Sequence, residues 1–128
     1  MSETVYVKKD LWDAADSQDD IAPGEYQVRV KRVNHSDPEK IGVLYEIISE
    51  DKSMRNTFWD NFCLEYKKGM KMLRELLNAI DVTTEDNSDA GLVGFEPSQC
   101  IGKTLSVTVE HREDNGKTYV NVTQHLPF

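Results

Sequence analysis

The sequence has few cysteines and no long hydrophobic run. Only Cys63 and Cys100 occur among its 128 residues, and they do not cluster. No apolar stretch approaches the roughly 20 residues that a transmembrane helix needs. The first residues also lack the apolar segment of a secretory signal. We therefore expect both thiols to be reduced, no contact with a membrane, and a cytoplasmic protein that is not secreted.

Catalytic motifs are missing as well. The chain contains no CxxC, HExxH, GxSxG or Walker pattern, and its three histidines, His35, His111 and His125, stand far apart. The segment SDPEK is faintly similar to the Asp/Glu/Lys set of metal-dependent nucleases, but its members crowd one turn. The sequence therefore predicts no enzyme, no catalytic residue, no metal ligand and no cofactor.

Basic residues are fewer than acidic residues, and the excess of acidic residues is confined to two segments. The formal net charge is −8, but residues 1–20 hold six acidic residues against two lysines, and residues 81–97 hold five acidic residues and no base. The remaining body is close to neutral and is able to present a basic face. We expect an acidic arm over 1–20, one folded domain over 21–128, and an acidic loop over 83–97.

The hydrophobic pattern of the body predicts strands, one helix, and further strands. Alternating apolar residues predict strands within 24–33, 41–49 and 54–64, and the break at Lys31-Arg32-Val33 indicates a bulge or a strand end. Met70, Leu73, Leu77 and Ile80 form a helical stripe within 66–80. Residues 103–126 predict a hairpin around Asn115-Gly116, the pair that favours a type I′ turn.

Three strands, a helix and a hairpin are the element order of the OB-fold, a five-stranded Greek-key barrel with its helix between strands 3 and 4. Barrels of this kind commonly bind oligonucleotides or oligosaccharides on the face of strands 2 and 3. The sequence therefore predicts a mainly β protein of this class.

Aromatic and basic residues gather around the third strand, as in proteins that stack bases on rings and hold phosphates with cations. Trp59 and Phe62 have opposite parity on this strand, so one of them faces the core. The aromatic residues have an alternative interpretation as core, and the helix lysines have one as a solvated surface. The candidate residues for binding single-stranded DNA are Trp59, Phe62, Arg29, Lys31, Lys52, Arg55, Arg112, Lys117 and Tyr119.

The ordered segments GEYQVRV, YEI, FWDNFCLE, GMKMLRELLNAI, IGKTLSVTV and NGKTYVNV resemble a family of small phage-encoded single-stranded-DNA-binding proteins, long catalogued as a domain of unknown function. The resemblance covers about residues 22–126. It implies an OB-fold that coats single-stranded DNA with little sequence preference during phage replication or recombination, in the cytoplasm of the host cell. Trp59, with Phe62 as a second candidate, would then be the stacking platform.

Two features bear on partners. The acidic arm and the C-terminal Pro127-Phe128, which is similar to the hydrophobic tip of bacterial single-stranded-DNA-binding proteins, are candidate contacts for phage or host replication and recombination proteins. A homodimer is also compatible with the sequence. The alternative function, favoured by the acidity of 1–20 and 81–97, is a protein-interaction module or DNA mimic that acts on a host nucleic-acid enzyme.

Overall fold

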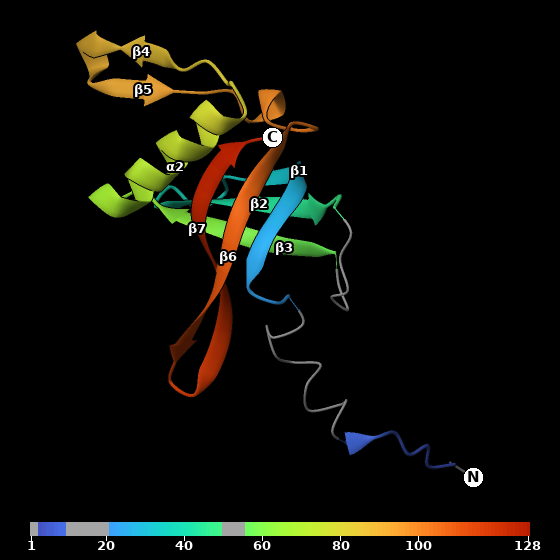
Figure 1. Cartoon of the computed structure of the whole chain (residues 1–128). Coiled ribbons are helices and arrows are strands. Elements are labelled where there is room, and N and C mark those ends of the chain that lie inside the picture. Colours follow the sequence, from blue (N-terminus) through green and yellow to red (C-terminus); the bar gives the residue numbers. More distant parts are fainter. Residues whose placement is uncertain (1–2, 10–20, 50–55) are drawn as a thin grey trace.

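The protein was analysed as a computed structural model that describes residues 3–9, 21–49 and 56–128 (Figure 1). From residue 21 on, the described chain is mainly β, with seven strands in two sheets and one α-helix. No helix in the described ranges is long and apolar enough to cross a bilayer.

Five strands form the main sheet, which is antiparallel throughout. They are β1 (Gly24–Asn34), β2 (Lys40–Ile47), β3 (Thr57–Cys63), β6 (Thr104–Asp114) and β7 (Lys117–Pro127), in the spatial order β3-β2-β1-β6-β7. The expected succession of three strands, a helix and a hairpin is confirmed. The sheet is not closed, because no backbone ladder joins β3 to β7 within the described residues.

The bulge expected in the first strand is present and decides which side chains face outward. Val28 and Val30 are fully buried, and the pairing between β1 and β2 shifts after Val30, so that Arg32 rather than Lys31 stands opposite Leu44. A bulge adds one residue to its strand and reverses the alternation beyond it. Arg32 therefore faces the outer side of the sheet.

The helix α2 (Lys67–Ala79) packs against β3 and β7 (Figure 1). Leu73, Leu76 and Leu77 are buried, as the stripe predicted, whereas Met70 is 43% exposed and lies outside the core. Gly69 marks a close approach between helix and strand, since a Cβ added there would lie 1.9 Å from the backbone oxygen of Cys63. No other residue type fits at this position without moving the backbone.

The region expected as an acidic loop contains a second, two-stranded sheet. β4 (Glu85–Asn87) and β5 (Leu92–Gly94) pair through a turn that includes the short 3-10 helix η2 (Ser88–Ala90). A further 3-10 helix, η3 (Pro97–Gln99), leads into β6. All residues of both strands are exposed, so the hydrophobic alternation that marks a half-buried strand is absent from the sequence.

A buried polar network bridges the gap between β3 and β7. The Tyr45 hydroxyl donates to Asp60 Oδ2 at 2.8 Å, and His125 Nε2 lies 2.7 Å from the same oxygen. On the other side of the ring, His125 Nδ1 lies 3.1 Å from Glu75 Oε1, which also accepts from the backbone N–H of His125. Side chains from β2, β3, β7 and α2 thus meet where the backbone ladder is interrupted.

Candidate nucleic-acid interface

β3 separates its two aromatic candidates by simple alternation. Phe58 and Phe62 face the core at 2% and 1% exposure, while Trp59 faces out and is 40% exposed. Of the two rings, Trp59 is therefore the exposed one, and Phe62 is too buried to serve as a stacking platform; DNA binding by Trp59 stays a prediction. It packs inside against the ring of His125, with the centroids 5.6 Å apart.

The Trp59 side chain rests on a glycine of the neighbouring strand. A Cβ built on Gly42 would lie 3.3 Å and 3.4 Å from Trp59 Cε3 and Cζ3, and 3.0 Å from Asn61 Oδ1. The six-membered part of the indole therefore covers the glycine backbone closely. Any larger residue at position 42 would displace the ring.

A small open hollow of about 220 Å³ adjoins this ring. It is lined by Asn34, Asp37, Lys40, Gly42, Trp59 and Asn61. The β1–β2 loop beside it is fixed by three local side-chain bonds. Asn34 Oδ1 accepts from the Ser36 N–H at 3.1 Å and from the Ser36 hydroxyl at 2.8 Å, and Asp37 Oδ1 accepts from the Glu39 N–H at 2.9 Å. The hollow combines one aromatic wall, one cation (Lys40), one carboxylate (Asp37) and amide groups.

The predicted cations of β1 lie on the same outer face but share one carboxylate. Arg29 Nη1 is 3.4 Å from Glu46 Oε1, and Lys31 Nζ is 3.7 Å from Glu46 Oε2. Both basic side chains are about half exposed, at 49% and 54%. Water screens such pairs strongly, so the guanidinium and ammonium groups remain available to a phosphate.

Arg32 was not among the predicted site residues, although it aligns best with the ring. It stands opposite Leu44, and Leu44 stands opposite Trp59, so the three form one row across the outer face. Arg32 is exposed, and it forms no ion pair with another residue of the described ranges. The predicted bulge was the signal that could have found it, because a bulge turns the next residue outward.

The remaining predicted residues form a separate group near the end of the β6–β7 hairpin. Arg112 Cζ lies 5.9 Å from the Tyr119 ring centroid, and Lys117 follows the turn. Arg112 is eight residues along β6 from Thr104, the partner of Arg29, a distance of roughly 27 Å at 3.4 Å per residue. The structure therefore does not bring this group together with Trp59. The two other predicted residues, Lys52 and Arg55, lie outside the described residues.

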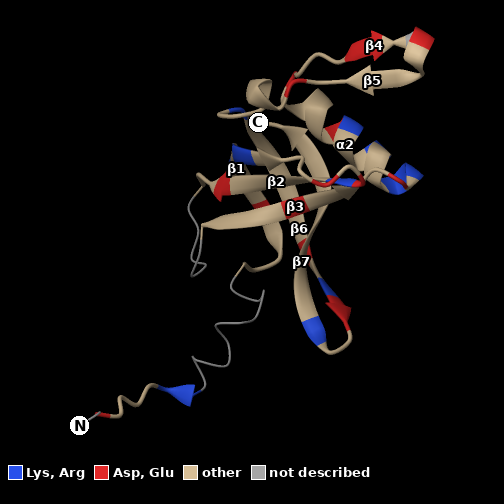
Figure 2. Cartoon of the chain, turned by 180° about the vertical axis from the view of Figure 1, so that it is seen from behind, with Lys and Arg blue, Asp and Glu red and all other residues tan. Residues whose placement is uncertain are grey.

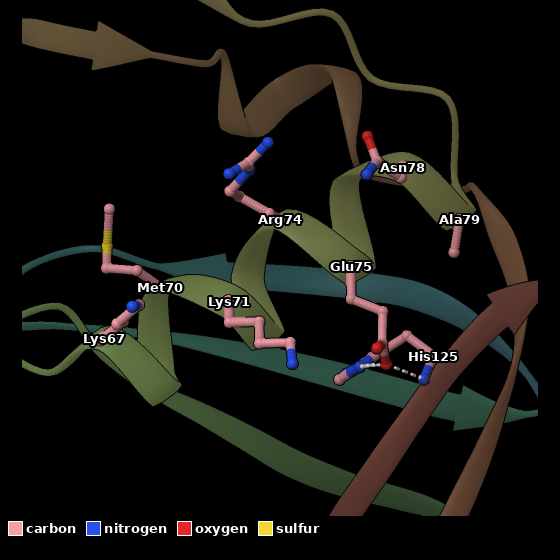
Figure 3. Close-up of a pocket in the computed structure, with 8 residues that line it drawn as sticks. All are labelled: Lys67, Met70, Lys71, Arg74, Glu75, Asn78, Ala79 and His125. Atoms are coloured by element: carbon pink, nitrogen blue, oxygen red, sulfur yellow. Dashed lines mark hydrogen bonds and ion pairs between the residues drawn. The ribbon is translucent and has the colours of Figure 1, made fainter.

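A larger hollow, of about 690 Å³, runs along the exposed side of α2 (Figure 3). Lys67, Lys71 and Arg74 line it, together with the Glu75–His125 pair. Over the whole described fold, basic residues are found on β1, on α2 and near the tip of the β6–β7 hairpin, whereas β4 is acidic (Figure 2). No cluster of three metal-ligating side chains occurs among the residues that the structure describes.

Burial perturbs two ionisable groups behind this face. The pKa of Tyr45 is raised well above 10.0, first by burial and then by the neighbouring Asp60 carboxylate. Burial also raises the pKa of the Cys100 thiol above 9.0, and the nearby Lys103 partly opposes this shift. Neither group lines the Trp59 hollow.

The chain belongs to a family whose model matches residues 8–128 and is described as "Protein of unknown function (DUF669)". No curated protein matches the sequence.

Proposed function

We propose that this protein binds single-stranded DNA through the outer face of β1, β2 and β3, with Trp59 as the stacking platform. The proposal extends to coating of the strand, with little sequence preference, during phage replication or recombination. The observation that carries it is the exposed indole, supported on Gly42 and aligned across the strands with the exposed Arg32.

The chemistry of the face suits a single strand better than a duplex. A base stacked on an aromatic ring contributes about 1–3 kcal/mol, and every base has a π-face, so stacking discriminates little between sequences. Arg29, Lys31, Arg32 and Lys40 surround the ring, where they would contact the phosphates. The acidic β4 belongs to the other sheet, and on this face the four bases accompany two carboxylates, Glu46 and Asp37.

For the fold, the more specific proposal is that this mainly β protein is an OB-fold. The order β3-β2-β1-β6-β7 and the helix between β3 and β6 support it, because an OB barrel has this neighbour order and closes between its third and fifth strands. Here the contact between Asp60 and His125 takes the place of that closing ladder. We propose an open barrel whose seam is held by side chains.

The test is a fluorescence titration with oligo-dT at low and high salt, in a Trp12→Phe background so that Trp59 alone reports. We expect quenching by single strands, little by a duplex, and weaker binding as salt rises because counterions are released. Trp59→Ala should weaken binding, followed by filter retention, by about 5- to 150-fold, which corresponds to the 1–3 kcal/mol of one stacked base. Tyr66→Ala is the matched control, since Tyr66 is 67% exposed but lies outside the hollow.

The outcomes separate the hypotheses. If the Trp59→Ala protein binds as tightly as its parent, the platform lies elsewhere, and Tyr119 is the next ring to test. If the parent protein fails to bind any oligonucleotide at low salt, the proposal is wrong, and the acidic interaction module becomes the better interpretation.

A further inference from the structure

The N-terminal segment contains three exposed apolar residues in a row. Val5, Tyr6 and Val7 are 82%, 88% and 64% exposed. β-branched and aromatic residues favour the strand conformation, and an exposed apolar run of this kind marks an interaction surface. Lys8 and Lys9 follow it directly.

An apolar groove of about 510 Å³ lies between α2 and the small sheet. Met70, Leu73 and Leu77 form the helix side, and Val93 and Phe95 form the opposite side. Val93 belongs to β5, which pairs with β4 along one edge only within the described residues. The groove therefore offers both an apolar floor and an edge of unpaired backbone groups, which is the requirement for adding a strand.

The charges around the groove complement those of the N-terminal segment. Residues 85–96 include Glu85, Asp86, Asp89 and Glu96 and contain no lysine or arginine. Arg74, on the helix side, is the one base that lines the groove among the residues that the structure describes. An apolar strand that ends in two lysines matches an apolar groove bordered by carboxylates.

We propose that residues 4–9 of one copy bind in this groove of a second copy, as an additional strand along β5. Alternation would place Val5 and Val7 on one side and Tyr6 on the other, and Lys8 and Lys9 would approach the carboxylates of the β4–β5 hairpin. The contact is between copies of the protein and does not rest on DNA binding.

The described body begins on the main sheet, whereas the groove lies between α2 and the small sheet. The described body begins at Ile21, whose carbonyl oxygen lies 2.6 Å from His111 Nε2 on β6. β1, which follows Ile21, begins on the side of the main sheet away from the β4–β5 hairpin (Figure 1). A contact that joins two different surfaces of identical molecules is heterologous, and such contacts produce rings or open chains rather than closed two-fold dimers.

Cross-linking identifies the occupant. Tyr6 is replaced by the photoreactive p-benzoylphenylalanine in the full-length protein, and unlabelled and ¹⁵N-labelled copies are mixed before irradiation. We expect cross-linked peptides from residues 70–95, about half of them joining a labelled to an unlabelled copy. The same probe at Tyr119, also an exposed ring, is the control and should not reach these residues.

Sedimentation of exposed-site variants provides a second readout. Val5→Asp with Val7→Asp removes the apolar strand, and Val93→Asp, at a position 69% exposed, blocks the groove without touching the core. Each variant alone should stay monomeric at concentrations where the parent associates, and a mixture of the two should form dimers and nothing larger. Cross-links confined to single copies would show that the segment folds onto its own groove, and no cross-link to 70–95 would remove the site altogether; either result overturns the proposal.

Discussion

Asp60→Ala is the sharpest test of how the sheet is held together. The Asp60 side chain accepts from Tyr45 and lies 2.7 Å from His125 Nε2, and these two partners are 0% and 2% exposed. Removing the carboxylate leaves two buried polar groups without an acceptor, at about 1–3 kcal/mol each. We therefore expect a loss of about 3–5 kcal/mol in the free energy of unfolding, which is a large share of the roughly 5–15 kcal/mol of an ordinary domain.

Chemical denaturation followed by circular dichroism measures this loss, and a thermal scan should show a midpoint lowered by roughly 10–20 °C. Asp60→Asn is the matched control, because it keeps an acceptor oxygen but removes the charge, and should cost about 1–3 kcal/mol. A double-mutant cycle with Tyr45→Phe isolates one bond of the network. A loss below about 1 kcal/mol for Asp60→Ala would refute the reasoning that the network closes the seam.

Three further predictions concern groups fixed by close packing. Gly69→Ala should destabilise the protein in urea, although alanine gains about 1 kcal/mol as a helix former, because its Cβ would lie 1.9 Å from the Cys63 oxygen; equal or higher stability would contradict the close approach. The raised pKa of Tyr45 means that the folded state keeps a proton that the unfolded state releases near pH 10. The free energy of unfolding should therefore fall as pH rises above about 10. Absorbance at 295 nm should show this tyrosine ionising only when the protein unfolds. Cys100, buried and with a raised pKa, should react with a thiol reagent much more slowly than the half-buried Cys63, and peptide mapping of the modified protein gives the two rates.

Local signals were sufficient where the chain itself specifies the structure. Asn115 and Gly116 have φ values of 52° and 76°, so the type I′ turn expected from this pair is confirmed. The helix was predictable from its stripe, except that Met70 turned out to be exposed. The start of the helix was less clear, because Gly69 is a poor helix former. The reason for a glycine at this position is the close approach to the Cys63 backbone, which is a tertiary contact that the local sequence does not reveal.

Tertiary features could not be read in the same way. Asp60 and His125 are 65 residues apart and have no motif, so their contact depends on the arrangement of β3 and β7. The β4–β5 hairpin could not be predicted, because all residues of its strands are exposed and the sequence therefore lacks the hydrophobic alternation of a half-buried strand. The position of Trp59 was one of two possibilities, and only the packing of Phe62 in the core decided it.

β3 connects the buried network to the exposed ring, because neighbouring residues of a strand point to opposite faces. Trp59 faces out, and Asp60, the next residue, faces in toward His125. Within the described residues β3 has a backbone ladder only with β2, so its other side depends on side chains for its position. Weakening the network should therefore displace the ring as well as lower the stability.

This link can be separated from simple unfolding. At a temperature where Asp60→Asn remains folded, we expect its affinity for oligo-dT to fall several-fold because Trp59 is less firmly placed. In a Trp59→Ala background the same Asp60→Asn change should have little further effect, since the group through which it acts is gone. An equal loss in both backgrounds would mean that the carboxylate acts on DNA binding by another route, and the seam would then have only a structural role.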